Sequence, residues 1–231
     1  MSNTPQNQSS IQKVSTFQDL ISTPFQGTCN AISWSRQLEG DFEEIVNAID
    51  FEGNMVEIDY EDLLALELSV DGQIARDIIL NDFKLLSDYG AAPVLNIIKN
   101  YEADEHPFFP TDVYSFHVDR SPIATDTFLC TYFGDASEIL PNEFAVQKIG
   151  FPEIRKKLRL EYFGDESGFE EYLIENYYDL HYQAMTEGKE INLGVGNLWR
   201  LAVDHPGSKV LPSVHRAPRE KNGYIRLLMI C

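Results

Sequence analysis

Two side chains that can bind a metal ion lie two residues apart in the stretch SFHVDR, residues 115–120. The run 112–118 is typical of a β-strand, and a strand sends alternate side chains to opposite faces. His117 and Asp119 are therefore expected to point the same way. Such a pair can ligate a metal, or it can be a hydrogen-bonded pair on an edge strand, and an H-x-D match alone does not decide between the two.

A second histidine and an arginine stand near the C-terminus, in PSVHRAPREKNGYIRLLMIC. This stretch predicts a strand carrying His215, a turn at PREKNG and a final strand carrying Arg226. With the turn centred between residues 220 and 221, His215 would pair with Arg226 and share its face. Two imidazoles and one carboxylate form the ligand set of non-haem Fe(II) oxygen chemistry. An arginine fork suits the far carboxylate of a dicarboxylate such as 2-oxoglutarate.

In their order and spacing, these residues resemble the Fe(II)/2-oxoglutarate-dependent dioxygenases. The stretch GNLWRLAVDHPGSKVLPSVHRAP also looks like the segment that leads to the distal histidine in that family. The resemblance covers roughly residues 93–231. It implies a double-stranded β-helix, a cupin-like jelly-roll barrel, with Fe(II) bound by His117, Asp119 and His215 and with Arg226 gripping 2-oxoglutarate.

The resemblance also implies an activity, in which O2 and 2-oxoglutarate are consumed, succinate and CO2 are released, and a substrate is hydroxylated. Asp119 favours hydroxylation, because related halogenases lack this carboxylate. Leu228 departs from the family, since some branches carry a serine there. Thr131 is our candidate for the missing hydrogen bond to the co-substrate; strand parity places Thr127 on its face and Tyr132 on the other.

The other candidates have simpler alternatives. Tyr114, Asn96 and Trp199 could line a substrate pocket, although packing is the simpler role for each. The remaining histidines, His106, His181 and His205, are expected to face solvent or the edge of the core, with His205 the first substitute for His215. Arg200 and Arg216 are alternative anchors for 2-oxoglutarate, and Arg226 could instead form a salt bridge on the outer barrel wall.

The elements that must position these residues are mainly strands, with flanking helices. Helical spacing is expected within residues 40–90, with Gly90 as a C-terminal stop, and within an insert at 152–187 that begins at a capping box, Ser167 to Glu170. The barrel is expected over 93–231. Its strands are predicted at 93–99, 112–118, 126–133, 144–149, 191–201, 210–216 and 223–231.

Composition limits the class of protein. The 231 residues carry a net charge of −19, which argues against a nucleic-acid partner or an anionic membrane surface. The three cysteines are far apart and are expected to be reduced. Residues 1–15 are expected to be a disordered lead-in without secretory character, and 16–231 a single domain, so that we expect a cytoplasmic protein without a membrane anchor.

Three functions remain open. The first is a dioxygenase acting on a small molecule, an amino acid or a peptide side chain. The second is a cupin-like metal-binding protein, an isomerase or a sensor, which keeps the three ligands but does not need Arg226. The third is an interaction module whose acidic helices bind a basic partner; metal content separates it from the other two. The oligomeric state is not indicated.

Overall fold

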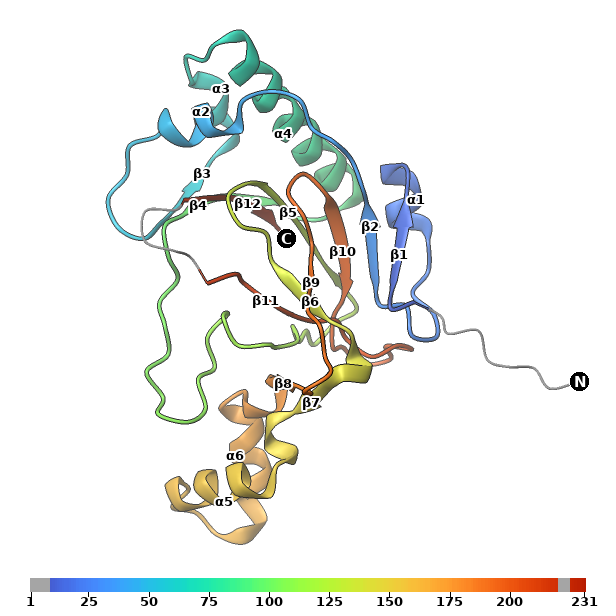
Figure 1. Cartoon of the computed structure of the whole chain (residues 1–231), viewed down its shortest axis with the longest axis vertical. Helices are drawn as coiled ribbons and strands as arrows, with labels where there is room; N and C mark the ends of the chain where they lie inside the picture. The colour runs from blue at the N-terminus through green and yellow to red at the C-terminus, as the bar shows by residue number, and fades with distance from the viewer. Residues whose placement is uncertain (1–8, 220–224) are drawn as a thin grey trace, which may run out of the picture.

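Two facing β-sheets form the centre of the computed structural model, which describes residues 9–219 and 225–231 (Figure 1). The strands of the larger sheet are β1 (Ile11–Val14), β2 (Ala31–Trp34), β3 (Met55–Ile58), β4 (Val94–Ile98), β5 (Asp126–Phe133), β10 (Leu198–Ala202) and β12 (Arg226–Ile230). Their order is β1-β2-β10-β5-β12-β4-β3. The smaller sheet contains β6 (Glu138–Leu140), β9 (Ile191–Asn192) and β11 (Val214–Arg216), in the order β11-β6-β9.

Apolar side chains from both sheets meet between them. Leu129 of β5 and Leu228 of β12 pack in one buried cluster with Ile139 of β6. Because side chains alternate along β5, Thr127, Leu129 and Thr131 share the face that looks toward the smaller sheet. This inner face is where polar side chains can meet a ligand enclosed between the sheets.

The chain passes repeatedly from one sheet to the other. It runs from β4 in the larger sheet to the segment around His117, back to β5, on to β6 and β9, back to β10, and then through β11 to β12. The segment around His117 belongs with the smaller sheet, because His117 and His215 of β11 exchange two backbone hydrogen bonds, each of 2.9 Å. This alternating path brings short segments far apart in sequence into register.

Helices cover the other face of the larger sheet (Figure 1). They are α2 (Phe42–Asn47), α3 (Tyr60–Ala65) and α4 (Val70–Tyr89), with α1 (Phe17–Ser22) beside β1 and β2. The Ser69 hydroxyl accepts from Gly72 N at the start of α4, and the helix ends at Gly90, whose φ of 98° is left-handed. Buried Ala75, Ile79 and Leu86 recur at helical spacing, so α4 packs one side on the sheet.

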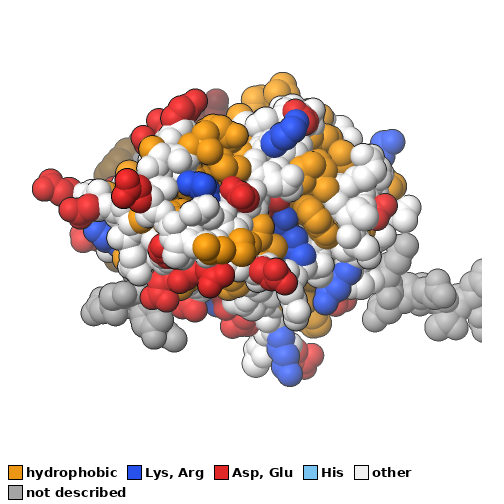
Figure 2. All heavy atoms as spheres, turned by 90° about the horizontal axis from the view of Figure 1, so that it is seen from above, with side chains coloured by type: hydrophobic (Ala, Val, Ile, Leu, Met, Phe, Trp, Pro, Cys, Tyr) orange, Lys and Arg blue, Asp and Glu red, His pale blue; other side chains and the backbone are white. Residues whose placement is uncertain are grey.

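The outer surface of this helical layer mixes apolar and charged groups. Figure 2, seen from above the helices, shows hydrophobic side chains gathered between acidic and basic ones. Leu64, Val70 and Ile74 are among the exposed apolar residues of α3 and α4. None of the helices in the described part of the chain has the length and apolar character needed to cross a membrane.

A largely helical insert separates β6 from β9. It contains β7 (Ala145–Gln147) paired with β8 (Tyr182–Ala184), and α5 (Pro152–Glu161) and α6 (Phe169–Glu175), with 3-10 turns at Asn142–Phe144, Lys148–Gly150, Glu166–Gly168 and Tyr178–Leu180. Leu158 and Leu173 pack with Phe109 in a small cluster of their own. Figure 1 shows α5 and α6 together, at the end of the molecule opposite to α2 and α3.

Several predicted elements are confirmed. β5 occupies the predicted residues 126–133, Gly90 ends α4, and the structure is mainly sheet with flanking helices. The run 191–201 is instead divided into β9 and β10, and 144–149 is β7 followed by a 3-10 turn. The helical capping box is wrong, because Asp165, not Ser167, accepts from Gly168 N ahead of α6.

Other predictions are wrong for clear physical reasons. Residues 11–14 form β1, parallel to β2, and are not part of a disordered lead-in. The predicted strand 112–118 is reduced to a bridge at His117, because the Asp112 carboxylate accepts from Tyr114 N and Ser115 N and turns the chain. The expected closed barrel is not found among the described residues, where the strands form separate sheets.

The predicted C-terminal hairpin is also wrong. β11 pairs with β6, whereas β12 pairs with β4 and β5 in the other sheet. His215 and Arg226 are therefore not ladder partners; they pair with Ile139 and Ile98 respectively. Residues 220–224 of the predicted turn lie outside the described residues.

A buried ion pair joins α4 to the outer face of β5. Arg36 Nη1 donates to Asp82 Oδ1 at 2.7 Å, the second guanidinium nitrogen contacts Oδ2, and Tyr132 Oη donates to Oδ2 at 2.6 Å. Burial raises the pKa of Tyr132 well above its ordinary value, so its hydroxyl keeps the proton that it donates. Asp82 is fully buried, and Arg36 and Tyr132 satisfy its carboxylate oxygens.

Removing this carboxylate should be costly. Asp82→Ala leaves the Arg36 guanidinium without its buried anion, and we expect a loss of about 3–5 kcal/mol in the free energy of unfolding, measured with urea. Asp88→Ala, which removes an exposed partner of Lys84 on the same helix, should cost far less. Equal effects of the two substitutions would contradict the role given to the buried pair.

Candidate metal centre

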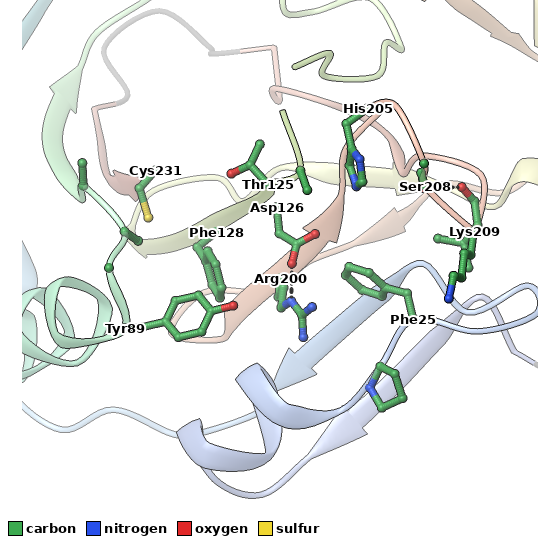
Figure 3. Close-up of a pocket in the computed structure, with 17 residues that line it drawn as sticks. Phe25, Tyr89, Thr125, Asp126, Phe128, Arg200, His205, Ser208, Lys209 and Cys231 are labelled. Carbon is green, nitrogen blue, oxygen red and sulfur yellow. Dashed lines mark hydrogen bonds and ion pairs between the residues drawn. The ribbon is translucent and has the colours of Figure 1, made fainter. Parts of the chain in front are cut away.

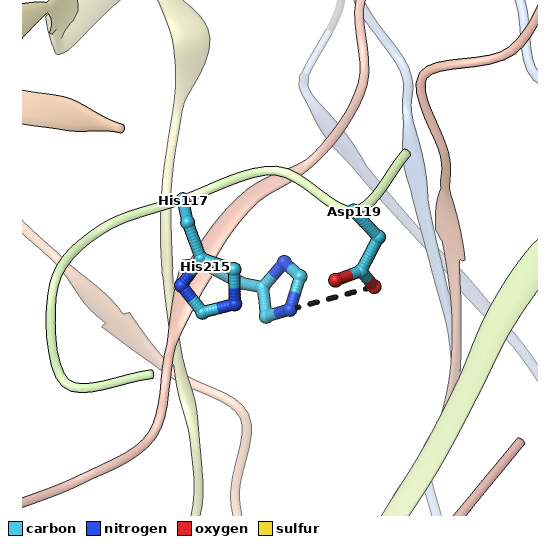
Figure 4. Close-up of side chains that lie close together, drawn as sticks. All are labelled: His117, Asp119 and His215. Carbon is cyan, nitrogen blue, oxygen red and sulfur yellow. Dashed lines mark ion pairs between the residues drawn. The ribbon is translucent and has the colours of Figure 1, made fainter. Parts of the chain in front are cut away.

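Three side chains that can ligate a metal converge on the inner face of the smaller sheet. One ligand atom from each of His117, Asp119 and His215 lies within 4.8 Å of the other two. The His215 Nε2 and Asp119 Oδ2 atoms are 3.7 Å apart, and a dashed line joins the two side chains in Figure 4. The structure thus brings together the three residues that the sequence singled out as ligands.

Backbone pairing creates this convergence. His117 and His215 are directly opposed in the bridge that joins their segments, so their side chains leave on the same face, with ring centroids 4.6 Å apart. His215 also pairs with Ile139, whose side chain packs between the two sheets. Asp119, two residues after His117, completes the set from the same segment.

The two imidazoles are held by their own chain. His117 Nδ1 lies 2.7 Å from Ser115 O, and His215 Nδ1 lies 3.1 Å from Ser213 O. A carbonyl oxygen only accepts, so in each neutral ring Nδ1 carries the hydrogen and Nε2 keeps the lone pair. This is the support that metal-ligating histidines need from their other ring nitrogen.

Asp119 is fixed by a hydroxyl from the larger sheet. Thr127 Oγ1 donates to Asp119 Oδ2 at 2.5 Å. Thr127 is a residue that sequence reasoning considered only for the co-substrate, and the parity of β5 was the signal that could have placed it here. The bond limits rotation of the carboxylate, whose oxygens keep lone pairs for a metal.

The electrostatics keep His117 and Asp119 in the forms that bind metal. Burial, with the nearby His215 as the second cause, lowers the pKa of the His117 imidazole to about 4, so this ring is neutral at pH 7. Burial opposes ionisation of Asp119, but attraction to His215 and the Thr127 hydrogen bond hold the pKa of this carboxyl below its ordinary value. A neutral imidazole and an ionised carboxylate can bind a divalent metal without first losing protons.

Arg226 reaches the same interior from β12. Its side chain is almost completely buried, and Nη2 donates to Thr131 Oγ1 at 3.2 Å and to Ser137 Oγ at 2.6 Å. Thr131 is the residue proposed from the sequence as a polar neighbour of the co-substrate, whereas Ser137 was missed because it lies just before a three-residue strand. The Ser137 contact links β12 to the smaller sheet.

The three residues predicted to line a substrate pocket lie in different parts of the structure. Asn96 is buried on β4 opposite Leu228, on the inner face. Trp199 packs in the core between the sheets, and its Nε1 donates to Leu193 O at 2.8 Å. Tyr114 Oη accepts from Tyr101 N at 2.8 Å, with the two rings edge to face, which is a packing arrangement.

Arg200 and Arg216, the alternative anchors for 2-oxoglutarate, point away from the metal ligands. Arg200 forms an ion pair with Asp126 at 2.6 Å, and Asp126 lies on the face of β5 opposite to Thr127. Arg216 pairs with Glu138 at 2.7 Å, on the face of the smaller sheet opposite to His215. Neither arginine faces the interior that holds the three ligands.

His181 is a neighbour that the sequence did not reveal. It was expected on the insert helix, yet it lies just after a 3-10 turn, is 4% exposed, and forms a backbone bridge with His117. Its Nδ1 is buried without a hydrogen-bond partner in the described residues, and burial lowers its pKa to about 3. The sequence did carry one signal: the large apolar residues Leu180 and Tyr182 lie two positions apart on either side of His181, a spacing that is typical of a strand.

Comparison with known proteins adds no assignment: no family model, no curated protein and no solved structure matches this chain. The donor set therefore carries the chemistry by itself. Two imidazoles and a carboxylate on one face can hold a divalent transition metal and leave coordination positions open.

The Thr127 hydroxyl gives a direct test of this site. Thr127→Val keeps the shape of the side chain but frees the Asp119 carboxylate, and we expect metal affinity to fall by about 10- to 100-fold. The measurement is an anaerobic Fe(II) titration in competition with a chromophoric chelator. Thr127→Ser keeps the hydroxyl and should retain most of the affinity; a Thr127→Val protein that binds as tightly as the wild type would contradict this geometry.

Proposed function

We propose that this protein is an Fe(II)- and 2-oxoglutarate-dependent dioxygenase that hydroxylates a small molecule, an amino acid or a peptide side chain. The observation that carries the proposal is the shared interior: the His117, Asp119 and His215 donors and the Arg226 guanidinium all lie between the same two sheets. A metal centre alone requires only the first three residues. A buried arginine nearby is what a dicarboxylate co-substrate additionally requires.

The path of the chain supports the corresponding fold. A jelly roll is built by strands that alternate between two facing sheets, and β4, the segment around His117, β5, β6, β9, β10, β11 and β12 follow such a path. We assign these segments as the double-stranded β-helix of the proposed enzyme. In this assignment β1, β2 and β3 extend the larger sheet beyond it.

Each polar residue then has a role. His117 and His215 hold the metal through Nε2, and Asp119 adds a negative charge that Thr127 keeps in place. Bound Fe(II) supplies the redox chemistry that activates O2. The fixed fork of Arg226 neutralises the far carboxylate of 2-oxoglutarate and so orients the opposite, 2-oxo-acid end toward the metal.

Two hydroxyls beside the guanidinium complete the proposed carboxylate site. Thr131 and Ser137 already accept from Arg226, and each has a hydroxyl hydrogen to donate to a bound carboxylate. They compensate for Leu228, which occupies the position where some dioxygenases carry a serine. The interior also contains apolar residues such as Leu129 and Trp199, which limit the access of water.

A second candidate rests on His181. This third imidazole is directly opposed to His117 across the backbone bridge, with ring centroids 5.9 Å apart. It adds a nitrogen donor beside the triad, as a cupin-like isomerase or sensor could use. Such a protein needs the metal but does not need Arg226, so the two candidates differ in their dependence on that residue.

Arg226 therefore discriminates between the candidates. Arg226→Ala should leave Fe(II) binding intact and lower the affinity for 2-oxoglutarate by about 30- to 1,000-fold, because a desolvated charge pair is lost. Arg226→Lys should recover part of the loss, since lysine keeps the charge but not the fork. The measurement is calorimetric titration of the anaerobic Fe(II) form with 2-oxoglutarate. Metal binding and circular dichroism report whether each variant is folded.

The matched control is Arg216→Ala. Arg216 lies on β11 but pairs with Glu138 on the outward face, so its loss should leave 2-oxoglutarate affinity unchanged. If wild type and a folded Arg226→Ala protein bind 2-oxoglutarate with equal affinity, the dioxygenase proposal is wrong and the cupin-like one is favoured.

Turnover should depend on the carboxylate ligand. Asp119→Ala removes the only anionic donor of the triad, and we expect Fe(II)-dependent formation of succinate from 2-oxoglutarate to fall at least 100-fold, measured by NMR in the presence of O2. Asp135→Ala, which removes an exposed carboxylate, is the control and should keep wild-type turnover. Undiminished turnover in Asp119→Ala would show that the carboxylate is not a ligand.

A further inference from the structure

A cavity of about 850 Å³ opens on the side of the larger sheet that faces away from the metal ligands. Its wall includes Asp126 and Phe128, whereas Thr127, between them in β5, points to Asp119 on the other face. Its volume lies within the range of small-molecule sites. Nothing in the proposed dioxygenase chemistry uses this cavity.

The floor of the cavity is polar but already neutralised. Arg200 Nε donates to Asp126 Oδ2 at 2.6 Å, and Arg200 Nη1 donates to the carbonyl oxygens of residues 20, 21 and 23 at 3.0–3.2 Å. Arg200 and Asp126 are thus a fixed, satisfied pair with little charge to offer a ligand. Figure 3 shows this pair at the centre, with Tyr89 on one side and Phe25 on the other.

The two sides of the cavity present aromatic surface. Tyr89, the last residue of α4, is 44% exposed and packs edge to face against Phe128, with ring centroids 5.6 Å apart. The Arg200 guanidinium lies over the Phe25 ring, 4.6 Å from the ring centroid. Both rings are therefore braced by their neighbours, which makes them suitable walls for a planar group.

The charge of the lining is unusual for so acidic a chain. Among the described residues that line the cavity, Asp126 is the only acidic side chain, and Arg200 already pairs with it. Lys209 lines the cavity near Phe25, opposite to Cys231, and makes no ion pair within residues 9–219 and 225–231 (Figure 3). With a net charge of −19 on the whole chain, a site with an uncompensated cation selects for anions against the general field.

We propose that this cavity binds a small planar aromatic compound that carries an anionic group, with the ring between Tyr89 and Phe25 and the anionic group at Lys209. An aromatic carboxylate and a nucleoside monophosphate share this chemistry. The site is separate from the metal centre, so its occupation does not require the dioxygenase proposal to hold.

The test is calorimetric and ligand-observed NMR titration of the metal-free full chain with benzoate, adenosine monophosphate and benzylamine. We expect benzoate or adenosine monophosphate to bind saturably at one site, and benzylamine, of similar shape but opposite charge, to bind at least about 10-fold more weakly. Binding of benzoate alone or of the nucleotide alone identifies the source of the anionic group, and binding of both shows that the site recognises the chemistry that they share.

Matched variants locate the site. Lys209→Gln and Tyr89→Leu should each lower the affinity for the anionic ligand by about 10-fold. Lys156→Gln removes an exposed lysine of the insert, and Tyr60→Leu removes a half-exposed tyrosine that also packs edge to face on a phenylalanine; both should bind like the wild type. Asp119→Ala should also bind normally, which separates this site from the metal centre.

Two results would overturn the proposal. One is that neither anionic compound binds with a Kd below about 5 mM, a limit corresponding to very weak association. The other is that Lys209→Gln and Tyr89→Leu both leave the affinity within twofold of the wild type.

Discussion

The site depends on one pair of backbone hydrogen bonds, exchanged between His117 and His215. These bonds attach an otherwise irregular segment to β11 and fix the register in which two imidazoles leave on the same face. A slip of one residue would turn one of the rings to the outer face of the sheet. The position of Asp119 follows, because it is two residues further along the same segment.

The two faces of β5 carry different polar interactions. On its inner face Thr127 holds Asp119 and Thr131 contacts Arg226. On its outer face Tyr132 joins the buried pair of Arg36 and Asp82, which anchors α4. A rigid strand that is buried on both faces is a suitable support for a metal centre, because ligands must be held to within a fraction of an ångström.

The parts of the site that follow from local geometry could be predicted from the sequence. The alternation of β5 required only strand parity, whereas the two-residue spacing of His117 and Asp119 pointed to the right pair although their segment forms only a bridge. The partner of β11 could not be predicted in this way. The turn residues after β11 suggested a hairpin with the last strand, but in the structure β11 pairs with β6, which is distant in the sequence. Strands as short as β6 and β9 carry too few residues to show a period of two, and His181 is brought to His117 from 64 positions away along the chain.

The central claim is that His117, Asp119 and His215 hold an Fe(II) that 2-oxoglutarate chelates, and anaerobic absorption spectroscopy tests it most directly. Adding 2-oxoglutarate to the Fe(II) form should produce a weak visible charge-transfer band that saturates at one equivalent. The band should be absent in His215→Ala and retained in His205→Ala, which changes a histidine outside the triad. Iron binding without the band, or no saturable iron binding, would contradict the account.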